Sequence, residues 1–471
     1  MLNDSYRVTV GLEVHAELAT KSKMFCGCEN DPHDALPNTH ICPVCLAHPG
    51  TLPVANEEAI AMVLLFGRAV GAQAATYSEF DRKNYFYPDI PKAYQISQYA
   101  FPFLTGGELL GVTLTRVHLE EDTARSSHEG EGVSLVDFNR AGVPLMELVT
   151  EPVIHDAKTA GAFARELQLL LKTLKISGAQ MERGEMRVEA NISVSKTDEL
   201  GTKVEVKNLN SFKSVEAAID YEVSRQVDTL MKGERVEQET RGWDEVKQKT
   251  FTQRSKETAK DYRYFPDPDL PKMTLAKHDY FSPSRLDDIM PTLPSEIRLK
   301  YTNLGLPISQ IEQIVGDEFL AGYFAKLVAD TDLKNEGLRL AANYLTSDVQ
   351  ALRQAGMSIG LSPASFADLV KLLTEDKITS RVAKDLLIEI ISVGGDPVAL
   401  ATERGLLKSN DPNTLLPLVQ EIIAEQPVVV ADYRAGKDSA LQFLVGQGMK
   451  KSRGSANPGL LADLLRQEII G

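Results

Sequence analysis

The sequence predicts an α+β fold, with an antiparallel sheet in the first part of the chain and helices in the rest. Residues 186–194 alternate apolar and polar side chains, and Arg187, Glu189 and Asn191 lie on the polar face. Strands that are polar on one face are typical of antiparallel sheets with one covered face. After His278 the chain contains no histidine, cysteine or tryptophan and shows the period of successive helices. We therefore expect chemistry in the first part and packing or docking in the second.

The length of 471 residues exceeds one ordinary hydrophobic core and predicts two or three domains. The composition, 43% hydrophobic and 25% charged, is that of a globular protein. No run approaches the ~18 apolar residues of a membrane span, and no basic-then-apolar leader is visible, so we expect a cytoplasmic protein with no membrane partner. A net charge of −15 disfavours a surface that binds nucleic acid throughout but allows a local basic patch.

The first half-polar strand is residues 8–18, where apolar side chains alternate with Glu13, His15 and Glu17. Residues two apart share a strand face, so any two of the three could hold one cation. Alone, this pattern leaves a metal site, an acid–base set and a solvated strand face open. A second polar group, in residues 116–125, favours a metal site, because crowded carboxylates repel one another unless a cation joins them. Carboxylate oxygens suit Mg²⁺, and an imidazole among them leaves Mn²⁺ as an alternative.

The four cysteines are clustered, in the pattern CGC, thirteen residues, CPVC. Two close pairs, Cys26 with Cys28 and Cys42 with Cys45, can complete the tetrahedral thiolate cage that structural Zn²⁺ prefers. An iron–sulfur cluster and a redox pair are the alternatives. Nearby histidines could replace one thiolate: His33, His40 and His48.

Residues 81–99 contain four tyrosines among two lysines and an arginine. Aromatic rings interleaved with cations suit a nucleotide base or a tRNA end, and they equally suit a loop that packs over a domain edge. The chain has no GxxxxGK[ST] loop and no GxGxxG motif after a strand, so ATP, if bound, would lie on a sheet with metal ions. It also lacks a Ser-Ser-Lys amidase signature and a cysteine nucleophile outside the cluster, so it should not hydrolyse glutamine by itself.

Several helix signals follow along the chain. Ser211 is the expected N-cap of a helix that ends near Gly233. A proline-rich stretch up to Pro294 marks the exit from the catalytic part. Beyond it, Ser362–Pro363 and Asn457–Pro458 are pairs of N-cap and first-position proline. Before the last helix, a glycine-rich turn carries three cations that suit either a phosphate contact or a solubilising loop. These are Lys450, Lys451 and Arg453.

Ordered motifs give the sequence a family resemblance: GLEVHAEL, DRKNYFYPD…PKAYQISQ, HLEEDTAR, DFNRAGVPLMELVTEP, MRVEANIS, VKNLNSF, ETRGWDE and DYRYFPDPDLP. Together they resemble the B subunits of aspartyl/glutamyl-tRNA amidotransferases. The tail motif, FLVGQGMKKSRGSANPGLL, resembles the end of the same family, which is shared with YqeY-like proteins. The match runs from residue 8 almost to the C-terminus.

The resemblance implies three domains: a catalytic cradle with a zinc-binding insertion in residues 1–292, a helical domain in residues 293–405, and a YqeY-like, tRNA-binding tail in residues 406–471. The cradle would be similar to the antiparallel catalytic fold of glutamine synthetase. The implied activity is that of an ATP-dependent carbon–nitrogen ligase with glutamine as amido donor. The side-chain carboxylate of Glu-tRNA(Gln) or Asp-tRNA(Asn) is phosphorylated, and ammonia then displaces phosphate. The A subunit, an amidase, would supply the ammonia, and a small C subunit would complete the heterotrimer.

The resemblance also implies site residues. Glu13, His15 and Glu121 would bind Mg²⁺, and Lys83 would line the ammonia exit or contact phosphate. Strand alternation alone prefers Glu120, and a local bulge could reconcile the two. The cysteines would bind a structural Zn²⁺ outside the catalytic centre. The polar strand faces predict an ATP and aminoacyl pocket formed by Arg187, Glu189, Asn191, Lys207 and Asn208.

Two other classes of function stay open from the sequence. One is a non-catalytic tRNA-docking protein with a zinc module and a helical tail. The other is a ligase that amidates a free amino acid, as glutamine synthetase does.

Overall fold

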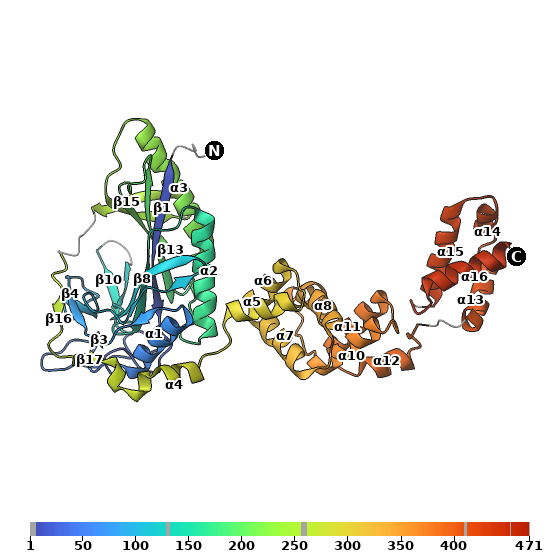
Figure 1. The fold of residues 1–471 in the computed structure, drawn as a ribbon, viewed down its shortest axis with the longest axis horizontal. Helices are drawn as coiled ribbons and strands as arrows, with labels where there is room; N and C mark the ends of the chain where they lie inside the picture. The colour runs from blue at the N-terminus through green and yellow to red at the C-terminus, as the bar shows by residue number, and fades with distance from the viewer. Residues whose placement is uncertain (1–5, 129–131, 256–260, 409–411, 453, 471) are drawn as a thin grey trace. The chain divides into compact units, whose positions relative to one another are not determined.

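The computed structural model describes residues 6–128, 132–255, 261–408, 412–452 and 454–470 (Figure 1). The chain divides into two compact units, Met1–Pro294 and Ser295–Gly471. The first unit mixes a large sheet with helices, and the described part of the second unit is helical. The α+β class is therefore confirmed, whereas the three-domain division with boundaries near residues 292 and 405 stays a prediction.

A ten-stranded sheet dominates the described part of the first unit, in the order β15-β14-β13-β12-β1-β11-β8-β6-β2, with β7 paired to β8. All neighbouring strands are antiparallel except β13 and β14, as the half-polar strands predicted. Their bounds are β1 Arg7–Glu17, β2 Gln73–Ala74, β6 Leu104–Thr105, β7 Glu108–Leu109, β8 Val112–Glu121, β11 Pro144–Thr150, β12 Met186–Ser195, β13 Val204–Leu209, β14 Glu239–Asp244 and β15 Lys249–Ser255.

One face of this sheet is apolar and is covered by helices (Figure 1). In β1, Val10, Leu12 and Val14 are almost completely buried, and burying such a side chain contributes roughly 1.5–3 kcal/mol. Glu13 and His15 of the same strand lie on the opposite face, because successive side chains alternate. The covering helices are α1 Glu57–Ala69, α2 Ala157–Thr173 and α3 Phe212–Met231.

Helix α3 begins and ends as expected. The Ser211 side chain accepts a hydrogen bond from Ser214 N (3.0 Å), and Gly233 adopts a left-handed φ of 78° just past the helix.

Smaller elements complete the first unit beside the main sheet. A three-stranded sheet contains β16 Phe265–Pro266, β4 Asp81–Asn84 and β5 Tyr94–Ser97, in that order. It contacts β8, where Ser97 Oγ donates to Glu120 Oε2 over 3.0 Å. Two further two-stranded sheets and short helices belong to the unit: β9 Arg125–His128 with β10 Ser134–Asp137, β3 Tyr77–Ser78 with β17 Met273–Thr274, η1 Leu275–Lys277, η2 Asp279–Phe281 and α4 Pro283–Asp288.

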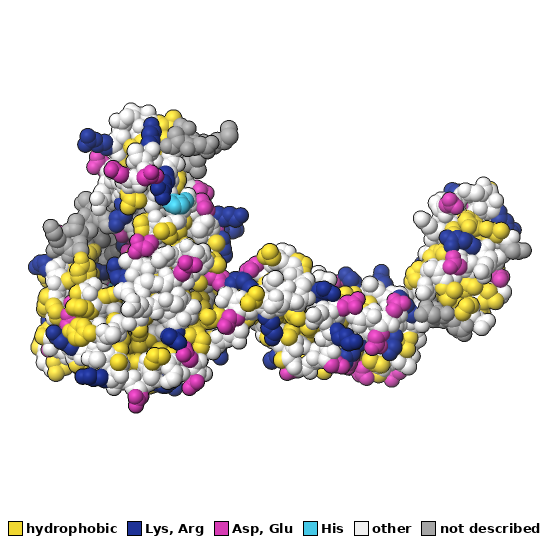
Figure 2. Space-filling view, viewed as in Figure 1, with side chains coloured by type: hydrophobic (Ala, Val, Ile, Leu, Met, Phe, Trp, Pro, Cys, Tyr) yellow, Lys and Arg dark blue, Asp and Glu magenta, His cyan; other side chains and the backbone are white. Residues whose placement is uncertain are grey.

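The second unit is built from short helices, and Figure 2 shows basic and acidic side chains interspersed on its viewed face. Both predicted N-caps form: Ser362 Oγ accepts from Ser365 N (3.1 Å), and Asn457 Oδ1 accepts from Gly459 N (3.0 Å). The helices are α5 Pro294–Asn303, α6 Ile308–Gly316, α7 Glu318–Asp330, α8 Asn335–Tyr344, the π-helix η3 Leu345–Val349, α9 Gln350–Gln354, α10 Pro363–Thr374, α11 Ser380–Val393, α12 Pro397–Glu403, α13 Pro412–Glu425, α14 Pro427–Arg434, α15 Asp438–Lys451 and α16 Pro458–Ile470.

The last four helices share a hydrophobic core of their own, which includes Val419, Leu444 and Leu465. Within the described ranges, no single helix has the length and apolar character to cross a membrane, although α13 and α14 meet that criterion together as a pair bent by 94°.

Candidate active site

A row of polar side chains crosses four neighbouring strands of the main sheet. The register pairs His118 of β8 with Glu147 of β11, Glu147 with His15 of β1, and His15 with Arg187 of β12. Directly paired residues of antiparallel strands share a face. The row therefore forms a polar floor on the sheet face opposite the helices.

Glu147 is the centre of this floor. Its Oε2 atom lies 3.3 Å from His15 Nε2 and 3.3 Å from His118 Nε2. Burial alone would raise the pKa of Glu147, but the neighbouring His118 and His15 hold it well below its ordinary value. Conversely, burial would lower the pKa of His15, but its hydrogen bond with Glu147 and the charges of Glu147, Glu120 and Glu13 raise it to about 9. The floor thus holds an ionised carboxylate between two imidazoles.

A second row carries further carboxylates. Glu13 is paired with Glu189 of β12, and the carboxylates of Glu13, Glu189 and Glu205 approach within 4.8 Å of one another. Burial, followed by the charge of Glu147, raises the pKa of Glu13 to about 7. Lys207 Nζ lies 2.7 Å from Glu189 Oε2 and partly offsets this negative charge.

The donor set of the floor fits a hard divalent cation. Ligand atoms of Glu13, His15 and Glu147 lie within 4.8 Å of one another, as do those of His118, Glu120 and Glu147. Carboxylate oxygens are the preferred ligands of Mg²⁺, and a cation would offset the burial and the charge of Glu147 that together raise the pKa of Glu13. The geometry therefore brings together two of the three predicted ligands, Glu13 and His15.

Glu121, the third predicted ligand, lies elsewhere. Its carboxylate accepts hydrogen bonds from Lys92 Nζ (2.7 Å) and from Ile96 N (2.9 Å). It is Glu120 that approaches the floor, with Oε1 3.7 Å from His15 Nε2.

Strand alternation explains why Glu120, and not Glu121, faces the floor. The pairing of β8 with β11 runs without interruption from Arg116 to Glu121, and the bulge in this pair falls between Val149 and Thr150 instead. No bulge interrupts β8 between Arg116 and Glu121, where one would be needed to turn Glu121 toward the floor. In this geometry Glu121 therefore lies apart from Glu13 and His15, and its assignment as a metal ligand stays a prediction.

A pocket of about 310 Å³ is lined by residues of the floor and by Lys83 of β4. Lys83 Nζ lies 5.2 Å from the ring centroid of Tyr262. Burial would lower the pKa of Lys83, but the carboxylates, above all Glu120, raise it well above its ordinary value. An ammonium group thus faces the carboxylate floor. The pocket is lined by Glu13, Lys83, Gln98, Tyr99, Arg116, His118, Glu147, Lys203, Glu205, Lys207, Thr240, Tyr262 and Tyr264.

The predicted nucleotide and aminoacyl residues are only partly brought together. Glu189 and Lys207 lie beside the carboxylates of the second row, and Asn191 is paired with Glu205 of the pocket wall. Arg187 lies at the edge of the floor, where its NH2 group is 3.0 Å from Asp122 Oδ2.

Asn208 does not belong to this group. It is exposed, adopts a left-handed φ of 66° near an irregularity of the β12–β13 pair, and does not line the pocket. Alternation could not anticipate this, because an irregular register reverses the direction in which a side chain points.

Sequence reasoning missed Glu147, the central residue of the floor. Its motif, PLMELV, contains a single acid in an otherwise apolar run, and a lone carboxylate in a buried strand was the available signal. It also assigned no role to Arg116, whose NH2 lies 3.7 Å from Glu147 Oε1, or to Tyr262 and Tyr264.

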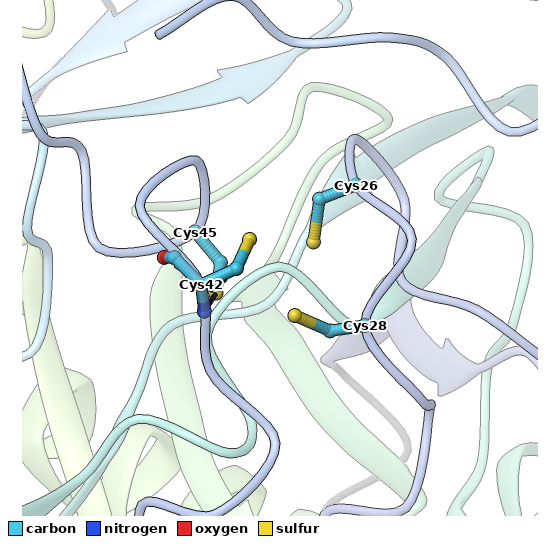
Figure 3. A group of neighbouring side chains, drawn as sticks. All are labelled: Cys26, Cys28, Cys42 and Cys45. Carbon is cyan, nitrogen blue, oxygen red and sulfur yellow. Dashed lines mark hydrogen bonds between the residues drawn. The ribbon is translucent and has the colours of Figure 1, made fainter.

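The four cysteines form a second candidate site. Figure 3 shows their sulfur atoms pointing toward a common centre from two loops. The four Sγ atoms lie within 4.8 Å of one another, and those of Cys42 and Cys45 are 3.9 Å apart. A Zn–S distance of about 2.3 Å places the sulfurs of a regular tetrahedron about 3.8 Å apart. The cluster can therefore hold a metal ion, which is consistent with structural Zn²⁺.

The pKa values of the thiols differ. A hydrogen bond from Cys26 lowers the pKa of Cys45 to about 4, whereas burial raises the pKa of Cys28 to about 11. The histidines do not join them in any metal-holding group of the described residues. His33 instead bridges Glu17 Oε2 (2.7 Å) and Arg125 NH2 (2.9 Å).

The tail cations differ from their predicted place. Lys450 and Lys451 occupy the last turn of α15 rather than a glycine-rich turn, and Arg453 lies outside the described residues. Lys451 Nζ is 2.6 Å from both Glu421 Oε1 and Glu425 Oε1, so much of its charge is locally compensated.

Comparison with known proteins gives the family. The GatB/GatE catalytic-domain model matches residues 8–280, and the GatB domain model matches residues 323–469. Proteins named as the B subunit of aspartyl/glutamyl-tRNA(Asn/Gln) amidotransferase are 45% identical in Thermus thermophilus and 44% identical in Thermomicrobium roseum. Each comparison covers 98% of this chain and 99% of the relative. The chain belongs to the GatB family. The protein of that name from Synechocystis, 40% identical, is covered over 97% of its length.

Both candidate sites lie within the residues that the catalytic-domain model matches. The polar floor, Lys83 and the cysteine cluster all fall within the catalytic-domain match, and Lys450 and Lys451 fall within the second match.

Proposed function

We propose that this chain is the kinase and transamidase subunit of a tRNA-dependent amidotransferase. It uses ATP to phosphorylate the side-chain carboxylate of Glu-tRNA(Gln) or Asp-tRNA(Asn), and it amidates the product to Gln-tRNA(Gln) or Asn-tRNA(Asn). The A subunit, an amidase, supplies ammonia from glutamine, and a small C subunit completes a cytoplasmic heterotrimer. Family membership supports this proposal, since the relatives are named as the B subunit of such an enzyme.

The observation that carries the assignment of the site is the pocket between the carboxylate floor and Lys83. In the first step, a substrate carboxylate oxygen bonds to the γ-phosphorus of ATP while the bond to the β-phosphate oxygen breaks. In the second, ammonia attacks the acyl carbon, phosphate leaves, and the extra proton passes to solvent or base. Both steps require neutralisation of charge on phosphoryl oxygens.

The residues of the pocket contribute to these two steps in different ways. Glu13, His15 and Glu147 would hold Mg²⁺, which supplies charge neutralisation to the phosphate oxygens when bound. Lys83 and Arg116 also line the pocket and contribute fixed positive charge. His118 stays hydrogen-bonded to Glu147 and keeps that carboxylate oriented toward the pocket.

The proposal also includes the division into domains and the residues that bind tRNA and zinc. Residues 1–292 form a cradle that is similar to the catalytic fold of glutamine synthetase, residues 293–405 a helical domain, and residues 406–471 a YqeY-like tail. The tail contacts tRNA through Lys450, Lys451 and Arg453. The four cysteines bind structural Zn²⁺, supported by their mutual distances and thiolate chemistry.

Reconstitution tests the proposal. The chain is combined with its amidase and its small partner protein, Mg-ATP, ammonium and misacylated Glu-tRNA(Gln), and amidated aminoacyl-tRNA is measured. We expect turnover that requires ATP and tRNA, and that is lost in Glu147→Gln. Binding of tRNA without turnover in the full complex would indicate a docking protein, and amidation of free glutamate without tRNA would indicate a free amino-acid ligase; both results contradict the proposal.

A further inference from the structure

Lys23 is a buried cation beside the cysteine cluster. Its side chain has 0% exposure and is among the largest fully buried side chains of the described residues. In the part of the chain that the structure describes, the polar contacts of its ammonium group are two backbone carbonyls and one sulfur, and none is a carboxylate. A buried charge without a partner is strongly unfavourable, so the surroundings of Lys23 must supply a compensating anion.

The ammonium of Lys23 has three acceptors for its three protons. Nζ donates to Ala141 O (2.8 Å), to Phe138 O (3.2 Å) and to Cys45 Sγ (3.9 Å). Two of these are neutral carbonyls. The sulfur of Cys45 is the contact that can carry the compensating negative charge.

The main chain links Lys23 to the other cysteine pair. Its backbone N–H donates to Cys28 O over 3.0 Å, so one residue contacts both halves of the cluster. Gly142 packs against the same place: a Cβ built on it would lie 3.6 Å from Lys23 Cδ and 3.6 Å from Cys45 Cβ. The cluster, Lys23 and the turn of residues 138–142 are thus in direct contact.

When the four cysteines hold a metal ion, the net charge of the cluster favours a neighbouring cation such as Lys23. Four thiolates and one Zn²⁺ carry a net charge of −2, and an adjacent ammonium reduces this by one. Groups that donate hydrogen bonds to metal ligands hold them in orientation and tune the affinity of the site.

Resting on the proposed zinc site, we infer that Lys23 is its buried counter-charge. It donates an N–H···S hydrogen bond to the metal-bound thiolate of Cys45 and fastens the loaded cluster to the turn of residues 138–142. That turn leads into β11, the strand that carries Glu147.

Metal binding to the full chain tests this inference. Zn²⁺ affinity is measured by competition with a chelator, and Co²⁺ substitution gives the energy of the sulfur-to-metal charge-transfer band. Two neutral variants are compared: Lys23→Met, and Lys23→Gln, whose amide can still donate to the carbonyls. Both should lose about 10- to 100-fold in Zn²⁺ affinity, and their charge-transfer band should move to lower energy because the sulfur loses a hydrogen bond.

Two control variants test whether the effect comes from the positive charge of Lys23. Lys23→Arg keeps the positive charge and should stay within a few fold of the wild type, whereas exposed Lys21→Met should be unchanged. Unchanged Zn²⁺ affinity and an unshifted Co²⁺ band in folded Lys23→Gln, with a wild type that binds zinc, would overturn the inference while leaving the zinc site intact. A wild type that binds neither metal would overturn both.

Discussion

Replacing Glu147 by Gln should remove the carboxylate that contacts both His15 and His118, and should therefore lower the pKa of His15. The Glu147 side chain is buried, and its Oε2 lies 3.3 Å from the Nε2 atoms of both His15 and His118. Its hydrogen bond and its charge are the strongest influences that raise the pKa of His15 to about 9 against the effect of burial. Since burial persists in the variant and only the charges of Glu120 and Glu13 remain to oppose it, the pKa of His15 should fall from about 9 toward its ordinary 6.5. A change from about 9 to 6.5 corresponds to roughly 3 kcal/mol.

This change predicts how stability depends on pH. A pKa that is raised by folding gives stability that is complete below the unfolded value, here 6.5, and that is lost as pH rises through about 9. The Mg²⁺-free wild type should therefore lose up to roughly 3 kcal/mol of unfolding free energy over this range. The pKa of Glu13, raised from 4.5 to about 7, adds a loss in the same direction at lower pH. The Glu147→Gln variant should lack the contribution of His15.

Urea unfolding followed by tryptophan fluorescence measures this effect. Trp243 is the only tryptophan of the chain and is buried in the first unit, so its emission reports the unfolding of that unit. The matched control is Glu108→Gln, at an exposed position of β7 in the same sheet, which should keep the wild-type pH dependence. A Glu147→Gln variant with the wild-type slope between pH 6.5 and 9 would refute the reasoning.

Three further predictions concern single side chains. Lys83→Met should lower ammonia-dependent amidation by roughly 10²–10³, because it removes the cation that faces the floor; a steady-state rate within a few fold of wild type would argue against this role. Glu120→Gln should weaken Mg²⁺ affinity more than Glu121→Gln, since of these two glutamates Glu120 approaches His15 and Glu121 is paired with Lys92, and equal losses by titration calorimetry would contradict the observed geometry. Lys450→Ala should weaken tRNA binding more than Lys451→Ala, because Lys451 is already paired with two glutamates, and should reduce the salt slope by about 1; the reverse order in filter binding would count against it.

The sheet and half of its floor could be predicted from the sequence. Alternation places Glu13 and His15 on one face of β1 and predicts an antiparallel sheet, because the period of two is a local property of the chain. The cysteine spacing likewise predicts a cluster, and capping chemistry predicts the starts of α3, α10 and α16.

Other parts of the site depend on which strands become neighbours. Glu147 joins His15 only because β11 lies between β8 and β1, a pairing that no local pattern specifies. At residues 120 and 121 the resemblance selects Glu121, whereas alternation favours Glu120, the residue that lies near His15. Lys450 and Lys451 were expected in a turn because of nearby glycines, but α15 continues through them and tertiary packing of its apolar face outweighs that propensity.

The pocket lined by the floor and Lys83 is proposed as the phosphoryl-transfer centre. Crystals of the full chain with an ATP analogue and Mn²⁺ in place of Mg²⁺ would test it most directly, by anomalous diffraction at the manganese edge. We predict an anomalous peak in contact with the carboxylates of Glu13 and Glu147, beside His15, with the γ-phosphate facing Lys83. A nucleotide bound outside this pocket, or manganese bound only elsewhere, would contradict the claim.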